Sequence, residues 1–209
     1  MKKILLGLVA LSAVSFAAQG DMYLNTRIGM DLGAKYDKIS EGGLTDKTDG
    51  LGGEIALEGY KSITDNFDLG LGLAYQFHAD RDTENIYDDG DKFKISGVEY
   101  DSIPVYLTAK YNFNLNSEIK PYLKADLGYS FNFNPSDFEA SDGSHSEKAE
   151  MEVNNGLYWA LGGGLEYNNF TVDLMYAVTT AESKPKDEDD EKDNDYGRVV
   201  LSAGYRFNL

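Results

Sequence analysis

Eight stretches of the sequence place an apolar side chain at every second position. In residues 22–36, "MYLNTRIGMDLGAKY", charged Arg27 and Asp31 fall at odd-numbered positions, whereas apolar Ile28 falls at an even-numbered one. A period of two is that of a β-strand, because a helix repeats every 3.6 residues. The other seven stretches are residues 51–60, 67–78, 102–113, 119–133, 156–167, 170–180 and 197–209. Each is long enough to cross a bilayer as a tilted strand, which takes roughly nine to eleven residues.

The connectors between these stretches alternate between two lengths. Three are tight and rich in Asn, Asp and Ser, as in "SITDN", "NLNSE" and "NN". The other four, residues 37–50, 79–101, 134–155 and 181–196, are long and polar. Short turns on one side and long loops on the other are typical of an outer-membrane barrel, with the turns in the periplasm. The pattern predicts an all-β fold, an eight-stranded antiparallel up-and-down transmembrane β-barrel.

The N-terminus has the features of a secretory signal. Lys2 and Lys3 precede an apolar run from Ile4 to Val14, and small residues follow up to Ala17. The run is shorter than the roughly 20 residues of a transmembrane helix. We therefore expect residues 1–17 to be a signal peptide and residues 18–209 to be the barrel domain. The chain has no cysteine, so it has neither a lipid anchor attached at cysteine nor a disulfide.

The acidity of the chain is concentrated in the four long connectors. They hold 26 acidic and nine basic residues, a net charge of −17, whereas the strands and turns are almost neutral. Such a charge excludes nucleic acid as a partner, because a polyanion would be repelled. The expected surface is a set of acidic extracellular loops.

If the apolar faces of the strands contact lipid, the opposite faces line the barrel interior. Charges in so narrow a lumen must pair, because their desolvation is costly. The residues predicted to form this lumen charge network are Arg27, Asp31, Lys35, Glu54, Glu58, Asp68, Lys110, Lys124, Asp126, Glu166, Asp173, Arg198 and Arg206. Gly70, Gly72, Gly128, Gly162 and Gly164 share that face and would leave room for the long charged chains. In a secreted β-sandwich, the alternative fold, the polar faces would be outside and would need no such near-balance of charge.

Aromatic residues of the apolar faces gather near both ends of the strands. Those towards the long connectors are Tyr36, Tyr75, Phe77, Tyr129, Phe131, Phe133, Trp159 and Tyr176, and those near the turns are Phe67, Tyr111, Phe113, Tyr167, Phe170 and Phe207. Two such bands are expected where a barrel meets the two membrane interfaces.

Several of these segments resemble a known family. "SIPVYLTAKYNF", "IKPYLKADLGYS" and "LGGGLEY" are similar to strands four to six of small bacterial outer-membrane barrels, the group of the OmpA transmembrane domain, OmpX, OmpW and opacity-type proteins. The end "GYRFNL" resembles the C-terminal assembly signal of that family, with Tyr205, Phe207 and Leu209 alternating outward, although family members usually end in Phe. The resemblance implies architecture and not one activity, since members include structural proteins, adhesins, small channels and enzymes.

Residues that could carry chemistry are few. His78 and His145 are the only histidines. His78 lies on the lumen face with no motif around it, and a lipid A-modifying enzyme that used it is the most distant alternative. The acidic run "KPKDEDDEKDNDYG" offers Asp187, Asp189, Asp190, Asp193 and Asp195 as candidate ligands of a divalent cation. It lacks the glycine and distant Glu of an EF-hand, and such a run is more often a solvated loop tip.

The sequence as a whole favours a non-enzymatic outer-membrane barrel with a structural or surface-interaction, adhesin-like role and no cofactor. A narrow channel or an OmpW-like carrier of small solutes is the first alternative. The expected partners are outer-membrane lipids and lipopolysaccharide, the barrel-assembly machinery during biogenesis, divalent cations at the loops, and an extracellular partner that the sequence does not identify. We expect a monomer, exported to the outer membrane by its signal peptide.

Overall fold

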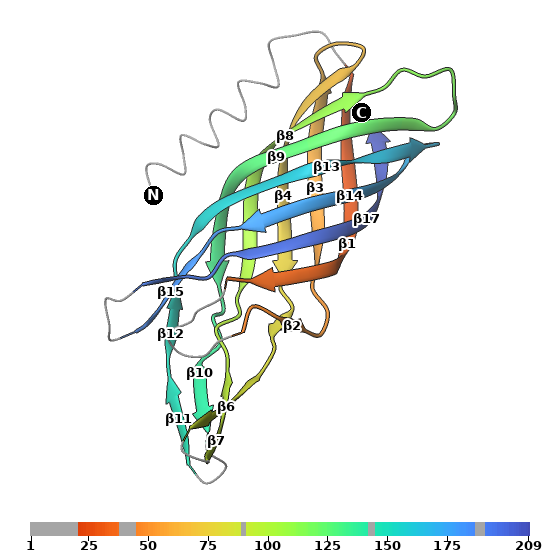
Figure 1. Ribbon diagram of the computed structural model, residues 1–209. Helices are drawn as coiled ribbons and strands as arrows, with labels where there is room; N and C mark the ends of the chain where they lie inside the picture. Colours follow the sequence, from red (N-terminus) through yellow and green to blue (C-terminus); the bar gives the residue numbers. More distant parts are fainter. Residues whose placement is uncertain (1–20, 38–44, 89–90, 142–144, 187–190) are drawn as a thin grey trace, which may run out of the picture.

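Eight long strands form a closed antiparallel barrel in the computed structural model, which describes residues 21–37, 45–88, 91–141, 145–186 and 191–209 (Figure 1). The barrel strands are β1 (Met22–Tyr36), β3 (Gly53–Ser62), β4 (Phe67–Phe77), β8 (Asp101–Asn112), β9 (Lys120–Phe133), β13 (Gly156–Tyr167), β14 (Phe170–Thr179) and β17 (Tyr196–Asn208). Each pairs with its neighbours in the chain, and β1 closes the barrel by pairing with β17. The predicted fold class is confirmed. Within the described residues, no helix has the length and apolarity needed to cross a membrane.

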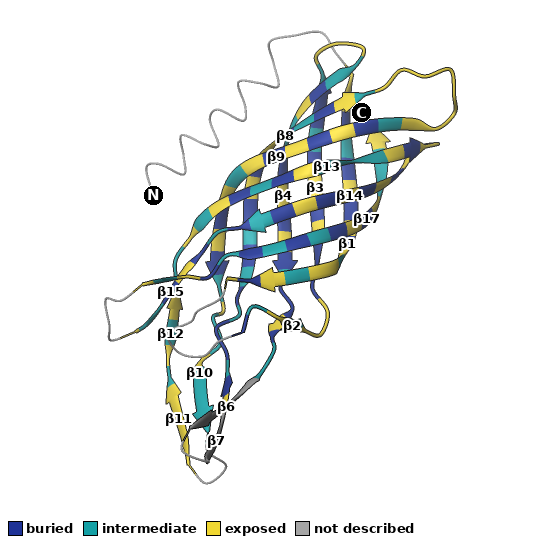
Figure 2. Cartoon of the chain, in the orientation of Figure 1, coloured by how far each residue is buried: buried dark blue, intermediate teal, exposed yellow. Residues whose placement is uncertain are grey.

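Burial alternates along every barrel strand, which separates a lipid face from a lumen face (Figure 2). On the outside, Ile28 is 64% exposed and Leu107 is 63% exposed. On the inside, Tyr106 and Glu58 are at most 1% exposed. The apolar side chains therefore point outward and the charged ones inward, as the alternation of residue types predicts.

One end of the barrel continues into short strands beyond the rim (Figure 1). The short strands are β2 (Thr48–Asp49), β5 (Asp80–Arg81), β6 (Glu84–Asp88), β7 (Asp91–Ser96), β10 (Phe138–Ser141), β11 (Ser146–Ala149), β12 (Met151–Val153), β15 (Glu182–Pro185) and β16 (Lys192–Asp193). They form a four-stranded sheet in the order β11-β10-β7-β6, a three-stranded sheet β12-β15-β16 and the pair β2-β5. Sequence analysis predicted only loops here, because segments of two to six residues are too short for an alternation to stand out.

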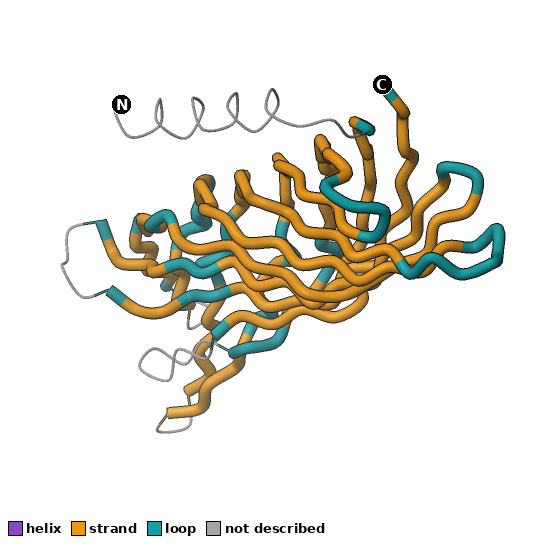
Figure 3. The backbone as a smooth tube through the Cα atoms, turned by 90° about the horizontal axis from the view of Figure 1, so that it is seen from above, coloured by secondary structure: helices purple, strands orange, loops and turns teal. Residues whose placement is uncertain are grey.

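The opposite end of the barrel carries the tight turns. The C-terminus lies at this end, away from the projecting sheet (Figures 1 and 3). The turn between β13 and β14 consists of Asn168 and Asn169, which have φ angles of 47° and 71°. Asparagine tolerates this left-handed conformation, which a two-residue hairpin turn of the right twist requires. The turn side is thus the periplasmic side, and the projecting sheet is extracellular.

A β-bulge in β1 overturns the prediction for two residues. The pairing of β1 with β17 shifts between Asp31 and Gly33, so that Leu32 is an extra residue in the strand. A one-residue insertion moves every following side chain to the other face. As a result Lys35, predicted to point into the lumen, is exposed, and Tyr36, predicted to face lipid, is 3% exposed inside the barrel. The simple alternation missed this reversal.

Candidate functional site: the barrel lumen and its extracellular mouth

Seven charged residues meet in the middle of the lumen, and we call them the central cluster. They are Arg27, Asp31, Glu54, Glu58, Lys124, Asp126 and Arg198, contributed by strands β1, β3, β9 and β17. Their side chains are at most 4% exposed. Charges this far from water are stable only when paired.

Glu58 is the most heavily bonded member of the central cluster. Its Oε1 lies 3.0 Å from Arg27 Nε and 2.5 Å from Lys124 Nζ. The hydroxyls of Tyr106 and Tyr60 donate to Oε1 and Oε2 at 2.8 and 2.9 Å. One carboxylate thus accepts from two cations and two phenols contributed by four strands, β1, β9, β8 and its own β3.

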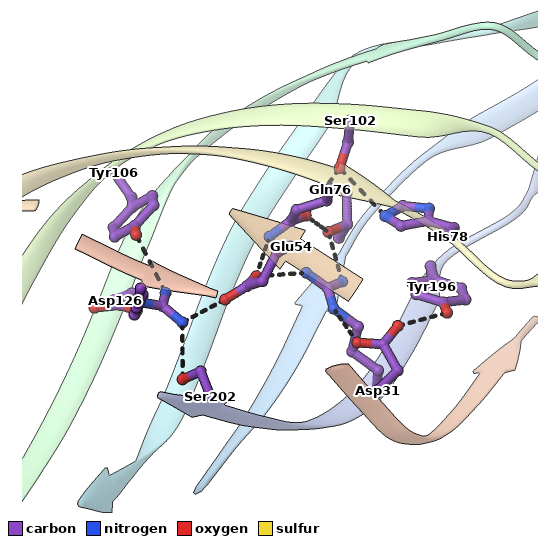
Figure 4. Close-up of polar contacts among 12 residues, drawn as sticks. Asp31, Glu54, Gln76, His78, Ser102, Tyr106, Asp126, Tyr196 and Ser202 are labelled. Carbon is purple, nitrogen blue, oxygen red and sulfur yellow. Dashed lines mark hydrogen bonds and ion pairs between the residues drawn. The ribbon is translucent and has the colours of Figure 1, made fainter. Parts of the chain in front are cut away.

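A second chain of contacts runs from Glu54 towards the extracellular side (Figure 4). Glu54 forms an ion pair with Arg27 and accepts from Gln76 Nε2 at 2.9 Å, while Arg198 Nη2 lies 3.5 Å from its Oε2. Arg198 Nε also lies 3.6 Å from Asp31 Oδ1. Asp31 in turn accepts from the Tyr196 hydroxyl at 2.8 Å. The cluster is therefore connected without a break to the mouth of the barrel.

Asp126 is the least satisfied acid of the central cluster. Its nearest cation is Lys124, whose Nζ lies 3.7 Å from Oδ2. Neither carboxylate oxygen has a hydrogen-bond partner among the described residues. The cluster holds three cations and four acids, and this acid is the one left over.

The periplasmic half of the lumen holds a further set of ion pairs. Glu166 lies 3.1 Å from Lys110 Nζ and 3.3 Å from Arg206 Nη1. Tyr23 donates to Asp68 at 2.8 Å, and Tyr122 donates to Asp173 at 2.6 Å. Here the acids are shared between cations and tyrosine hydroxyls, so the predicted ion pairs are only part of the network.

Tyrosine side chains, rather than long charged chains, lie against most of the lumen glycines, whereas Gly162 lies against Met175. A Cβ atom on Gly72 would collide with the ring of Tyr106, and one on Gly164 would lie 2.5 Å from the Tyr122 hydroxyl. The sequence analysis assigned this space to Arg, Lys and Glu. It gave no role to the tyrosines, although they share the charged face of their strands. They are Tyr23, Tyr60, Tyr106, Tyr122 and Tyr158, each at most 3% exposed.

Aromatic residues close the extracellular mouth, and we call Tyr36, His78, Tyr100 and Tyr196 the mouth cluster. His78, directly after β4, stacks on Tyr196 with ring centroids 4.0 Å apart and forms a T-shaped contact with Tyr100 at a centroid distance of 4.8 Å. Tyr36 packs on both other tyrosines, at 4.8 Å from Tyr196 and 6.1 Å from Tyr100. Burial lowers the pKa of His78 well below its usual 6.5, and the charge of Arg198 lowers it further.

Arg81 binds several segments on the extracellular side of the mouth cluster. Its guanidinium lies 4.5 Å from the centre of the Tyr36 ring and donates to the carbonyl oxygen of Asp37 at 2.9 Å. It also donates to Thr45 O at 2.6 Å and to the side chain of Asn194. Burial lowers the pKa of Arg81, partly offset by Tyr36 and Glu99. The sequence analysis had only counted this residue among the charges of the long connectors.

Most of the predicted network residues lie where the sequence placed them. Twelve of the thirteen contribute to the lumen, with Arg206 partly exposed at its periplasmic end. The exception is Lys35, whose side chain is 74% exposed and lies 3.4 Å from Asp46 on the outer surface. The bulge at Leu32 is the reason.

Among the described residues, the candidate metal ligands form no cluster and the candidate catalytic histidine is buried. Asp187, Asp189 and Asp190 lie outside the described residues, and Asp193 and Asp195 belong to no group of three potential ligands within them. His78 Nε2 does lie 3.2 Å from Ser102 Oγ, a proximity that the sequence did not predict. Both side chains are buried in the mouth, at 7% and 0% exposed.

The chain matches the family described as outer membrane protein beta-barrel domain over residues 4–207. The uncharacterized protein PM1543 of Pasteurella multocida (strain Pm70) is 30% identical over 235 aligned residues, which cover 99% of this chain and 98% of the relative. The crystal structure of OprG from Pseudomonas aeruginosa is 16% identical, covers 91% of this chain and 97% of its own, and has a TM-score of 0.50. A major outer membrane protein of Thermus thermophilus is also 16% identical, with a TM-score of 0.49 and 89% and 99% coverage. The chain belongs to the outer membrane protein beta-barrel domain family, which implies a bacterial outer membrane as its location.

Proposed function

We propose that this protein is a non-enzymatic barrel that serves the envelope structurally and acts at the cell surface through its acidic extracellular strands and loops, in the manner of an adhesin. The observation that carries the proposal is the sealed lumen. Central cluster side chains at most 4% exposed leave no water-filled path at that level. The parts of the protein free to meet other molecules are then the outer surfaces.

The distribution of charge supports the extracellular strands as the working surface. The long connectors hold the whole net charge of −17, and the projecting four-stranded sheet lies within two of them. Several loop charges pair at the surface, such as Lys186 with Glu150 at 2.7 Å and Lys148 with Glu139 at 3.2 Å. Exposed pairs of this kind contribute little to stability, so their acids remain open to a partner.

An attachment assay tests this proposal. Cells of a host that lacks its own small barrels would express the wild-type protein, or a variant with residues 84–96 and 138–149 replaced by short turns. Attachment to plates coated with collagen, fibronectin or laminin should rise with the wild type and return to the level of empty cells with the trimmed variant. Equal attachment of both, at equal barrel content on gels, would refute the surface role.

The unbroken line of polar side chains favours a narrow channel as the second candidate. Ion pairs such as that of Arg198 with Glu54, at 3.5 Å, are long enough to exchange partners, and charged side chains lining a pore can select ions. Liposome swelling with small sugars and amino acids separates the two functions. Uptake by the wild-type protein that survives removal of the projecting strands would favour the channel.

Biogenesis and partners complete the proposal. Residues 1–17 direct export, and Tyr205, Phe207 and Leu209 present the C-terminal signal to the barrel-assembly machinery. The last two are exposed on the outside of β17 and beyond its end, at 48% and 77%. The mature protein is a monomer among outer-membrane lipids and lipopolysaccharide, with divalent cations loosely bridging the acidic loops to those lipids. Lipid A modification by His78 is not part of the proposal, because the mouth cluster buries that residue.

A further inference from the structure

His78 holds the mouth of the barrel in a geometry that suits only its neutral form. Ser102 donates its hydroxyl proton to Gln76 Oε1 at 2.8 Å, which leaves Ser102 Oγ as the acceptor for the Nε2 proton of His78 at 3.2 Å (Figure 4). The other ring nitrogen, Nδ1, is buried and has no hydrogen-bond partner in the part of the chain that the structure describes. A second proton would therefore add a donor without an acceptor at a site cut off from water.

The groups around His78 offer a positive charge little compensation. One face of its ring stacks on Tyr196 from β17, and the ring forms a T-shaped contact with Tyr100 from the connector before β8. Arg198, also from β17, adds a like charge that disfavours the imidazolium, and its own acids are Glu54 and Asp31. From the remaining elements, β1 contributes Tyr36 and β5 contributes Arg81, which lies over the Tyr36 ring.

The same contacts attach the connector that follows β4 to the rest of the mouth. The amide of Ala79 donates to the Tyr196 hydroxyl at 3.0 Å, and the carbonyl of Ala79 accepts from the Tyr36 hydroxyl at 3.1 Å. Tyr100 donates to the carbonyl of Thr179 at 3.1 Å on the opposite wall. If the stack of His78 on Tyr196 separates, the residues that form these three hydrogen bonds lose the ring packing that positions them.

We propose that His78 is an acid-sensitive latch: protonation of its ring breaks the stack on Tyr196, releases Ala79 and admits water to the extracellular end of the lumen. No ligand is required, because the proton itself is the effector. The latch is independent of the adhesin-like role, since it concerns the mouth and not the projecting sheet.

The direction and size of the effect follow from linkage. In the closed mouth burial holds the pKa of His78 well below 6.5, whereas in an open, hydrated mouth the pKa returns towards about 6.5. The open form then binds more protons than the closed form as the pH falls below about 6.5. Its population relative to the closed form rises about tenfold for each pH unit, until the pKa of the closed form is reached.

Amide hydrogen exchange of Ala79, measured by NMR on the full mature chain in lipid nanodiscs, tests the latch. After correction for intrinsic exchange, its protection should fall about tenfold per pH unit between about pH 6.5 and 5. Amides in the middle of the barrel, such as that of Leu127, should keep their protection. Constant protection of Ala79 across this range would overturn the proposal.

Two substitutions identify the titrating group. His78→Phe keeps a ring for the stack but cannot be protonated, and His78→Gln keeps a donor for Ser102. If one of these variants fails to fold, the other still provides the test. In either, the dependence on pH should disappear, whereas His145→Gln, at the only other histidine, should leave it unchanged. A fall in protection that persists without His78 would overturn the proposal. Asp195 cannot imitate the effect, because burial raises its pKa and acid would therefore stabilise the closed form.

Discussion

Lys124 of β9 and Glu58 of β3 form an ion pair across the lumen, with Nζ 2.5 Å from Oε1. Both side chains are at most 1% exposed, and the same oxygen also accepts from Arg27 Nε at 3.0 Å. The two strands are not neighbours in the barrel, so the ion pair crosses the lumen and does not link adjacent strands. The pair thus fastens opposite walls to each other.

Glu58→Gln should destabilise the barrel strongly. The substitution leaves two buried cations without their shared acid, and breaking a buried pair in this way typically costs about 3 to 5 kcal/mol. Urea unfolding in phospholipid vesicles measures the change in the free energy of unfolding. Lys35→Gln is the control, because its exposed pair with Asp46 should contribute less than about 1 kcal/mol. Similar losses in both variants would argue against the lumen assignment of Glu58.

Leu127→Arg should impair insertion. Leu127 lies in the middle of β9 on the lipid face and is 56% exposed, and arginine at the bilayer midplane costs about 2 to 4 kcal/mol. Leu115, in a periplasmic turn, is 59% exposed and provides a matched control, since Leu115→Arg stays in water. Folded yield in vesicles is the readout. If both arginines are tolerated equally, the outward face of β9 does not contact lipid.

Gly72→Ala should disturb the packing of Tyr106. The added methyl would meet the ring, and overpacking of this kind typically costs about 1 to 3 kcal/mol. The cost should fall sharply in a Tyr106→Leu background, which removes the ring, so a double-mutant cycle isolates the contact. Gly33→Ala should be neutral, because no atom of the described residues, apart from the two chain neighbours of Gly33, lies within 4 Å of the added methyl. Additive effects of the Gly72 and Tyr106 changes would show that the two do not interact.

Deletion of Leu209 should slow assembly in cells but leave refolding in detergent nearly intact. The residue is 77% exposed beyond the end of β17, so it contributes little to the packed barrel. Unboiled gels of cell envelopes over time give the fraction of folded, faster-migrating protein. Unchanged assembly kinetics would mean that the terminal residue is not read as a signal.

The barrel could be predicted from the sequence because its two faces meet different media. A lipid face needs apolar residues and a filled lumen needs polar ones, so the period of two is enforced along all eight strands. The boundaries of β13, Gly156–Tyr167, and of β1, Met22–Tyr36, were predicted to the residue. The charges of the lumen were recognised by the same reasoning, since a charge on the face opposite to lipid must lie inside.

The features that the sequence did not predict depend on contacts between distant segments. The bulge at Leu32 inserts one residue into β1, but the alternation of residue types in the sequence continues through it. The sequence pattern therefore gives no sign of the bulge. In the sequence Arg81 is one loop charge among many, and only the fold brings Tyr36 and Asn194, from other parts of the chain, around it. The extracellular strands escaped notice because segments of two to six residues are too short for an alternation to stand out.

Single-molecule conductance in planar bilayers at neutral pH tests the central claim, the sealed lumen, most directly. The barrel should insert and stay silent, because the central cluster and the mouth cluster leave no open path for ions. Steady open steps at neutral pH from the wild-type protein, absent from a heat-denatured sample, would contradict the account and make this barrel a channel.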